Sequence, residues 1–301
     1  MTTWNMARMT ATLATDLHCG YLPLGFVSRT LPFVPSHIPL YALVPATISC
    51  LKLKNSDDTY RDLEHFLLEN VRFSPFFVLG DQDDSVLFPW KSEYRDRLEQ
   101  EYLGSRYGVA LDYETRGALE NRLFEIEVIL AKKRSAPSSM TRLRGYIFWK
   151  AAYNGQYSLD SDGRLIGKPL ADLIQESQWG GERNKGLGTI SNVECIPKDN
   201  LKENKVFGVV VPSLDKESPA LDWPGEKGVP FYLYYKTPGD TDKNGLEIQG
   251  KLMPLSGRRY DTKRGPGLKA AEPLTVWDMG WKTKKDISLG LGVRCCEILE
   301  K

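Results

Sequence analysis

Four glycines and two basic residues occur together in residues 179–190, WGGERNKGLGTI; the glycines are Gly180, Gly181, Gly186 and Gly188. Glycine adopts backbone angles that other residues avoid and lets a partner approach the peptide N–H groups. Successive N–H groups in such a turn can form a concavity that attracts anions. Because Arg183 and Lys185 add positive charge to the same turn, the segment predicts contact with a phosphate-bearing partner. A solvated surface turn is the alternative.

Two familiar phosphate-binding loops do not fit this segment. A P-loop ends in Gly-Lys-Ser/Thr, whereas Leu187 follows Gly186. A dinucleotide-binding loop has a third glycine three residues after a Gly-x-Gly pair, whereas Ser191 stands at that place after Gly188. Neither nucleotide hydrolysis nor dinucleotide binding is therefore expected.

A second basic stretch covers residues 250–269, GKLMPLSGRRYDTKRGPGLK, and has a local charge of +5. Its glycines predict a flexible loop, and arginine beside an aromatic ring in such a loop favours an RNA contact, with a base stacked on the ring. A solvated hairpin loop is the alternative. The residues singled out are Arg258, Arg259, Tyr260, Lys263 and Arg264, with Arg29 near the first expected strand as a further candidate.

The chain has only three histidines, His18, His37 and His65. His18 lies in the segment DLHCG close to Asp16 and could act as a general base in RNA cleavage, and His37 is a second candidate. For each of them a packed or surface histidine is the alternative. No HExxH motif or His/Cys cluster indicates a metal site, no GxSxG motif indicates a nucleophilic hydrolase, and no cofactor is expected.

Composition limits the class of protein. The 301 residues suit two modest domains or one large one, and 41% hydrophobic with 26% charged residues is typical of a folded, globular chain. A net charge of +1 means that local basic patches would have to hold a nucleic acid. Five cysteines without CxxC spacing are expected to be reduced and mostly buried. With no long apolar run and no secretory core, a soluble cytoplasmic protein is expected.

Periodicity predicts the elements that would position these residues. A period of two predicts a strand over residues 9–17, and an apolar stripe with two acids at its start predicts a helix over residues 57–71. Helices are also expected over 91–103, over 169–177, and after Ser36 as N-cap, with Pro39 in the first turn and Pro45 producing a kink. Further strands are expected over 73–79, 188–195, 206–211, 229–236, 246–255 and 291–299.

The clearest strand covers residues 123–130, where Phe124, Ile126 and Val128 face one way and Glu125 and Glu127 the other. Residues 141–151 are expected to pair with it across the polar loop KKRSAPSSM. A strand pair followed by a helix and the glycine-rich segment predicts an α+β unit with an antiparallel sheet. We expect one domain over residues 1–198 and a β-rich, irregular second domain over 199–301.

The order of these signals resembles the RAMP superfamily of CRISPR-associated proteins. The matching segments are TLATDLHCG, FVPSHIPLYAL, ALENRLFEIEVI and GGERNKGLGTI, which together lie within residues 10–193. The last of them is close to the family pattern GG-x-R-x-x-G-x-G. Ser36 stands before His37 where the family often has glycine, and the C-terminal third matches only loosely.

The resemblance implies a ferredoxin-like, RRM-like fold with a glycine-rich loop after its last helix, and a degenerate RRM-like or irregular β-rich second domain. A glycine loop in mid-chain before a β-rich tail is most similar to the non-catalytic subunit that caps the 5′ handle of the guide RNA in type III effector complexes (the "Cas-five", Csm/Cmr/Csx-like group). Its implied partners are guide RNA (crRNA), a large polymerase-like subunit and RAMP backbone subunits, with target RNA reached indirectly. Two alternatives remain within the superfamily: an endoribonuclease that processes precursor guide RNA with His18 or His37 as base, and a backbone subunit that cuts target RNA with Asp16.

Overall fold

A computed structural model describes residues 3–80, 85–201, 203, 205–210, 212–235, 247–255, 258–261, 265–270 and 273–299. The protein is mixed α/β and its sheets are mainly antiparallel. The principal sheet has the order β16-β1-β11-β6-β4, with β5 also paired to β11, and all these neighbours are antiparallel. Its strands are β1 (Trp4–Leu13), β4 (Phe33–Val34), β5 (Val71–Phe73), β6 (Phe76–Val78), β11 (Arg142–Lys150) and β16 (Ile190–Pro197).

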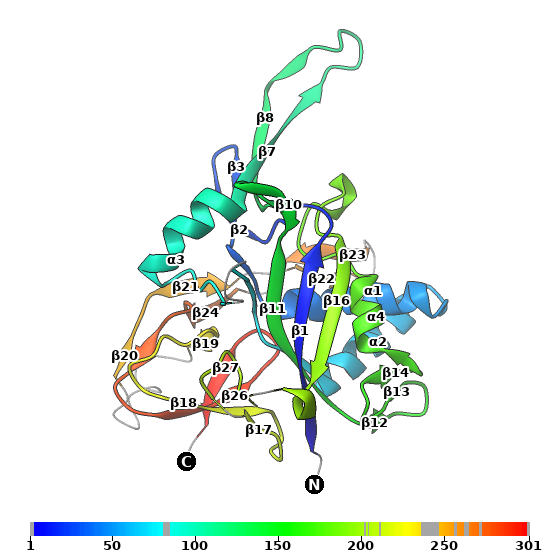
Figure 1. The fold of residues 1–301 in the computed structure, drawn as a ribbon. Helices are drawn as coiled ribbons and strands as arrows, with labels where there is room; N and C mark the ends of the chain where they lie inside the picture. Colours follow the sequence, from blue (N-terminus) through cyan, green and yellow to red (C-terminus); the bar gives the residue numbers. More distant parts are fainter. Residues whose placement is uncertain are drawn as a thin grey trace.

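Helices α1 (His37–Cys50), α2 (Asp57–Asn70) and α4 (Leu170–Gln175) lie on one side of this sheet (Figure 1). Alternate residues of β1, such as Ala7 and Met9, enter the core that these helices cover. The predicted helix over 57–71 is confirmed, and Ser56 caps it by accepting from the Thr59 N–H at 3.3 Å. The predicted cap at Ser36 is wrong, because its hydroxyl donates to the carbonyl oxygen of Val293 instead.

The C-terminal part forms a seven-stranded sheet on the other side of the principal sheet (Figure 1). Its order is β17-β18-β26-β27-β19-β24-β21, with bounds β17 (Pro212–Ser213), β18 (Ala220–Trp223), β19 (Leu233–Tyr234), β21 (Leu252–Leu255), β24 (Leu274–Trp277), β26 (Ile287–Leu291) and β27 (Cys296–Leu299). Two residues on the opposite face of β1, Trp4 and Met6, pack into this second core. The first strand of the chain therefore contributes to two cores.

A long hairpin projects from the body of the molecule (Figure 1). It consists of β7 (Leu103–Leu111) and β8 (Ala118–Ile129) and belongs to the sheet β2-β3-β8-β7, with β2 (Gly20–Leu24) and β3 (Val27–Thr30). Helix α3 (Ser92–Arg97) and the π-helical turn η1 (Leu98–Tyr102) lead into it, which confirms the helix expected over 91–103.

The expected pairing of residues 123–130 with residues 141–151 is wrong. Strand β8 pairs with β7 and β3, while β11 pairs with β1, β5 and β6. The polar loop between them forms its own small hairpin, β9 (Lys132–Lys133) with β10 (Ala136–Met140). The physical reason is burial: β11 is covered on both faces along most of its length, whereas β8 carries exposed and acidic residues on one face.

The other described strands are short. They are β12 (Ala152–Tyr153), β13 (Ser158–Leu159), β14 (Arg164–Leu165), β15 (Lys168–Pro169), β20 (Ile248–Gln249), β22 (Arg258–Asp261), β23 (Gly265–Ala270) and β25 (Lys282–Thr283), with 3-10 turns η2 (Arg183–Lys185) and η3 (Lys198–Asn200). The strand expected over 206–211 is wrong, since Val206 and Val210 form a single bridge around a turn. The strand expected over 9–17 ends at Leu13, and residues 73–79 form two strands instead of one. No helix among the described residues has the length and apolarity that crossing a bilayer requires.

Candidate nucleic-acid interface

The glycine-rich segment connects α4 to β16, and its base packs against the residues that follow β1. Gly180 and Gly188 have φ angles of +77° and +80°, a region that favours glycine. A Cβ atom on Gly188 would lie 1.9 Å from the carbonyl oxygen of Trp179, and one on Gly180 would lie 2.3 Å from that of His18. These two glycines are therefore required by close contact between backbone segments within the chain.

Three N–H groups of the segment donate to carbonyl oxygens of the chain itself. The N–H of Gly181 donates to His18 and that of Gly188 to Asp16, each at 2.8 Å, and the N–H of Gly186 donates to Arg183 at 3.0 Å. The expectation that these glycines offer free N–H groups to a partner is corrected for these three. An anion at the loop would have to be held mainly by side chains.

Trp179 anchors the base of the loop in the helix-covered core. Its side chain is fully buried, its indole N–H donates to the Ser177 hydroxyl at 2.9 Å, and its ring meets the Phe76 ring edge-on at 4.9 Å. This burial leaves the ring no surface for a ligand, so Trp179 fixes the loop in place.

The tip of the loop is exposed and contacts the projecting hairpin. Arg183, Asn184, Lys185 and Gly186 are exposed, and Glu182 before them has a left-handed φ of +55°. The Lys185 ammonium group is 2.8 Å from a Glu182 carboxylate oxygen and 4.2 Å from the centroid of the Phe124 ring. The loop tip is thereby attached to β8.

Phe124 was not recognised in the sequence as part of the site. Its ring lies across Gly108 on the neighbouring strand, where an added Cβ would be 2.2 Å from the ring. A glycine opposite an aromatic residue in a hairpin is a known stabilising pair. That pairing is visible in a sequence only after the strand register is known.

The candidate catalytic groups are engaged in structural contacts. The Asp16 carboxylate accepts from the Ala131 N–H at 2.8 Å and from the Arg106 Nε at 2.7 Å, and Asp16 is buried. His18 is also buried, with its Nδ1 2.7 Å from the Glu127 carbonyl oxygen. Each of them joins the end of β1 to the hairpin.

His37 lies at the start of α1. Burial, followed by the positive charge of Arg294, lowers the pKa of His37 to about 4. The imidazole is therefore neutral near pH 7. A group with so low a pKa is a weak base at that pH.

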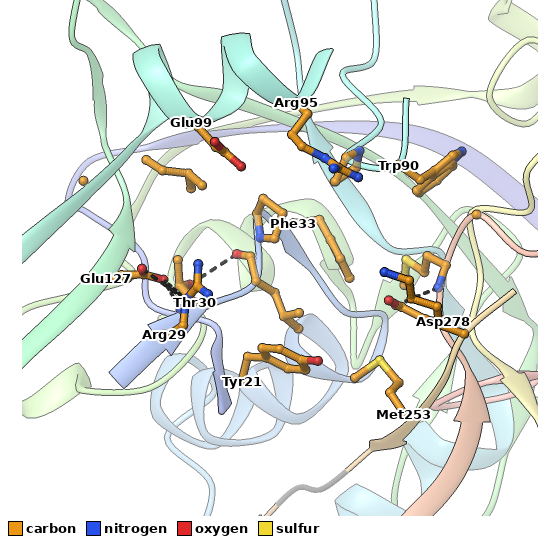
Figure 2. A pocket seen from close by; sticks show the side chains of 18 of the residues that line it. Tyr21, Arg29, Thr30, Phe33, Trp90, Arg95, Glu99, Glu127, Met253 and Asp278 are labelled. Carbon is orange, nitrogen blue, oxygen red and sulfur yellow. Dashed lines mark hydrogen bonds and ion pairs between the residues drawn. The ribbon is translucent and has the colours of Figure 1, made fainter. Parts of the chain in front are cut away.

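Arg29 lies on β3, at the edge of a cavity of about 760 Å³ between the hairpin, α3 and the C-terminal strands (Figure 2). Its Nε is 3.3 Å from both carboxylate oxygens of Glu127. Figure 2 labels residues of both charges and several aromatic rings around the cavity, among them Tyr21, Trp90, Arg95, Glu99 and Asp278. Burial raises the pKa of Asp278. Because both acidic and basic side chains line the cavity, its charge does not favour an anion over a cation.

The second basic stretch is described only in part. Arg258, Arg259 and Tyr260 lie on β22, which pairs with β23 in an antiparallel hairpin. Lys263 and Arg264 lie outside the described residues. In the part of the chain that is described, no three His, Cys, Asp or Glu side chains are grouped so that they could hold a metal ion.

No family model matches the chain, and no curated protein matches it. Among solved structures, it is similar to a chain of the Type III-B Cmr-beta complex bound to cognate target RNA and AMPPnP, with 13% identity, a TM-score of 0.45, and coverage of 92% of this chain and 86% of the other. A second similar chain comes from the Type III-B Cmr-beta complex bound to cognate target RNA, with 14% identity, a TM-score of 0.44 and the same coverage.

Proposed function

We propose that this chain is a guide-RNA-binding subunit of a type III CRISPR effector complex in antiviral defence, and that it holds the 5′ handle of the guide without cutting RNA. The observation that carries this proposal is the loop tip at Arg183–Lys185, which is exposed, basic and attached to the projecting hairpin. A rigidly held basic turn beside a long hairpin suits the backbone of a single RNA strand, because charge and a fixed position are what phosphate contacts require.

The strand order of the principal sheet supports a ferredoxin-like RAMP fold for the first part of the chain. Taking β5 and β6 together as the second strand, the sheet reads fourth, first, third, second. Helices α1 and α2 precede the second strand and α4 precedes the fourth. This is the β-α-β-β-α-β arrangement, and the glycine-rich segment follows its last helix, as the family resemblance implies.

Side chains would make the principal RNA contacts in this proposal. Among the described residues, no carboxylate forms an ion pair with Arg183 at the loop tip, whereas Lys185 is shared with Glu182 and Phe124. Arginine presents a planar set of donors that matches a phosphate. Gly180 and Gly188 have a structural role, because they allow the base of the loop to pack closely against the backbone of His18 and Trp179.

The test is RNA binding by the full chain carrying Arg183→Ala and Lys185→Ala. We expect weaker binding of a guide-length RNA and a smaller salt dependence, by about 0.7 in the slope of log K against log salt for each phosphate that the variant no longer neutralises. The matched control is Lys91→Ala with Lys284→Ala, two exposed lysines far from the loop in sequence. Unchanged affinity and slope in the loop variant would contradict the proposal.

The absence of catalysis is part of the proposal and has its own test. Asp16 and His18, two of the three candidate residues of the enzyme alternatives beside His37, are buried and contact Arg106, Ala131 and Glu127. Purified protein incubated with labelled repeat RNA in EDTA, and with target RNA in Mg²⁺, should leave both intact. Cleavage that His18→Ala or Asp16→Asn abolishes would establish one of the enzyme alternatives instead.

A further inference from the structure

Strand β7 is the last strand of the sheet β2-β3-β8-β7, so one of its two edges has no neighbouring strand among the described residues. Directly opposite residues of an antiparallel pair alternate between those that exchange two backbone hydrogen bonds and those that exchange none. The Leu130 N–H donates to the Tyr102 carbonyl oxygen at 2.8 Å, which fixes this alternation at the base of the hairpin. The register then continues without a shift from Leu103 to Val109, so the alternation holds along this part of β7.

This alternation places the backbone N–H and carbonyl groups of Tyr107 and Val109 on the outer edge of β7. Arg106, which lies between them, belongs to a pair that bonds to β8. Strand β8 shows the same alternation, because the N–H of Glu125, opposite Tyr107, points away from β7 and donates to the Phe26 carbonyl oxygen at 2.9 Å. The outer edge therefore offers a donor and an acceptor at each of two positions about 7 Å apart.

The residues at this edge also carry exposed apolar side chains. Tyr107 is 69% exposed and Val109 is 41% exposed, and Leu123, directly opposite Val109 on β8, is 53% exposed. Residues two apart on a strand, and residues directly opposite each other, share a face of the sheet. We call Tyr107, Val109 and Leu123 the apolar hairpin face. A long edge strand with exposed apolar residues is a site at which another strand can pair.

The apolar hairpin face is on the opposite side of the hairpin from the glycine-rich loop. Phe124, whose ring contacts the Lys185 ammonium group, directly follows Leu123 in β8. Successive side chains of a strand point to opposite faces. The hairpin, which projects from the body of the molecule (Figure 1), thus separates the loop tip from the apolar hairpin face. A partner bound to that face would not compete with RNA bound at the loop tip.

At its base, the same side of the hairpin leads into the cavity of about 760 Å³. Ser105, two residues before Tyr107, and Glu125, opposite Tyr107, both line that cavity. Trp90 and side chains of both charges form other parts of its wall. A protein segment lying along β7 could therefore place an apolar or a charged side chain in the cavity.

The chemistry of the outer edge favours a polypeptide strand over RNA. The edge alternates N–H donors and carbonyl acceptors, and the backbone of an extended peptide satisfies both kinds of group. Phosphate oxygens can accept from the N–H groups, but the carbonyl oxygens and the Glu125 carboxylate on the same face repel them. The exposed apolar side chains of Tyr107, Val109 and Leu123 are also suited to apolar side chains of a protein partner.

We infer that the outer edge of β7 binds an extended segment of another protein subunit, which adds a strand to the hairpin and places apolar side chains at every second position over the apolar hairpin face. In this mode of recognition the backbone hydrogen bonds supply affinity and the alternate side chains supply specificity. The inference goes beyond the proposed function, because it assigns a protein partner to a surface that the RNA at the loop tip does not use.

The test is residue-resolved amide hydrogen exchange of the full chain, alone and with overlapping synthetic peptides that cover the protein subunits copurifying with it. In the chain alone, the N–H groups of Tyr107 and Val109 should exchange faster than those of Arg106 and Gly108, which bond to β8. A peptide bound as an added strand should slow exchange at Tyr107 and Val109 by about tenfold or more. Exchange at Arg106 and Gly108 should change little.

Two variants distinguish the backbone contribution from the side-chain contribution. Val109→Pro removes one outward N–H and leaves the hydrogen bonds to β8, and proline is tolerated at an edge position of this kind. Tyr107→Lys places a charge on the apolar hairpin face. Each should weaken peptide binding by about tenfold or more. Tyr113→Lys is the matched control, because Tyr113 is 97% exposed and lies beyond the end of β7.

Three results would overturn the inference. The first is that no peptide slows exchange at Tyr107 and Val109, or that both variants bind the peptide as well as the unaltered chain does. The second is that guide-length RNA slows these two positions and no peptide does, which would assign the edge to RNA. The third is that exchange there slows as the concentration of the chain alone rises, which would assign the edge to a second copy. Normal RNA binding by the Arg183 and Lys185 variant would contradict the proposed function and leave this inference intact.

Discussion

The ammonium group of Lys185 lies 4.2 Å from the centroid of the Phe124 ring, and this contact joins the glycine-rich loop to the projecting hairpin. Phe124 in turn covers Gly108 on the neighbouring strand. The orientation of the hairpin and the position of the loop tip are therefore coupled through one side chain from each. A substitution of either residue should therefore change the energetic effect of substituting the other.

A double-mutant cycle between Lys185→Ala and Phe124→Ala measures this coupling. A cation near an aromatic face contributes about 0.5–1 kcal/mol at an exposed site, and Lys185 is exposed. We expect the two changes in unfolding free energy, measured by urea denaturation, to be non-additive by about that amount. Strict additivity would mean that the contact contributes nothing to stability.

The substitutions Gly186→Ala and Gly188→Ala should lower the free energy of unfolding by very different amounts. At Gly188 the φ of +80° and a Cβ atom 1.9 Å from the Trp179 carbonyl oxygen both oppose the substitution. At Gly186 the φ of +79° is similar, but nothing lies within 4 Å of the added Cβ. We expect Gly186→Ala to lower the free energy of unfolding by about 1 kcal/mol, because alanine is strained at this left-handed φ angle. Gly188→Ala should cost about 3 kcal/mol or more.

Thermal and urea denaturation of the two glycine variants provide the comparison, and each serves as the control for the other. Equal destabilisation would mean that the contact with Trp179 is not what requires glycine at position 188.

Removal of the Asp16 charge should weaken the junction between the end of β1 and the hairpin. Asparagine can still accept from the Ala131 N–H but loses the ion pair with Arg106. Because the Arg106 side chain is 65% exposed, the ion pair is partly screened. We expect Asp16→Asn to lower the unfolding free energy by about 1–2 kcal/mol. Asp58→Asn, on the exposed pair with Arg61, is the control and should stay within about 0.5 kcal/mol.

His37 should make the stability of the protein depend on pH. Its pKa is about 4 in the folded chain against 6.5 ordinarily, so between these values the unfolded chain binds a proton that the folded chain does not. Stability is therefore fully present above pH 6.5 and falls as the pH is lowered towards 4. The total loss is of the order of 3 kcal/mol.

Urea denaturation at several pH values, in the unaltered chain and in His37→Gln, isolates this contribution from that of the carboxylates. The variant should show a flatter profile between pH 6.5 and 4.5. His65→Gln is the control, because His65 is exposed on α2. The same profile in all three proteins would show that His37 does not control this range.

Local periodicity was sufficient to predict the helix over residues 57–71 and the presence of strands at β8, β11 and β16, whereas the strand expected over residues 9–17 lies at Trp4–Leu13. The helix over Asp57–Asn70 carries both its acidic first turn and its apolar stripe within 14 residues. Strand pairing could not be predicted in the same way. The alternation in β8 was read correctly, yet its partner is β7 and not β11, because pairing depends on which faces the rest of the chain covers.

The candidate site was located by its glycines, but their role was different from the expectation. Sequence spacing cannot distinguish a glycine that admits a ligand from one that admits a carbonyl oxygen of its own chain, as at Gly180 and Gly188. Contacts between β1 and β11 could not be predicted from the sequence, because Arg8 and Tyr146 are 138 positions apart and become neighbours only through the register of the two strands. The assigned domain boundary near residue 199 stays a prediction.

Strand β1 couples the unfolding of the two parts of the chain. Met6 lies in the core beneath the C-terminal sheet, and its neighbour Ala7 lies in the core beneath the helices. Trp90 of the first part also sits against Gly228 and Gly280 of the second, where an added Cβ would be 2.6 Å and 2.4 Å from its indole ring. The ten-residue strand β1 thus belongs to two hydrophobic cores. Loss of this strand from the sheet would expose both cores to solvent. Heating or force should accordingly melt the two parts in a single cooperative transition.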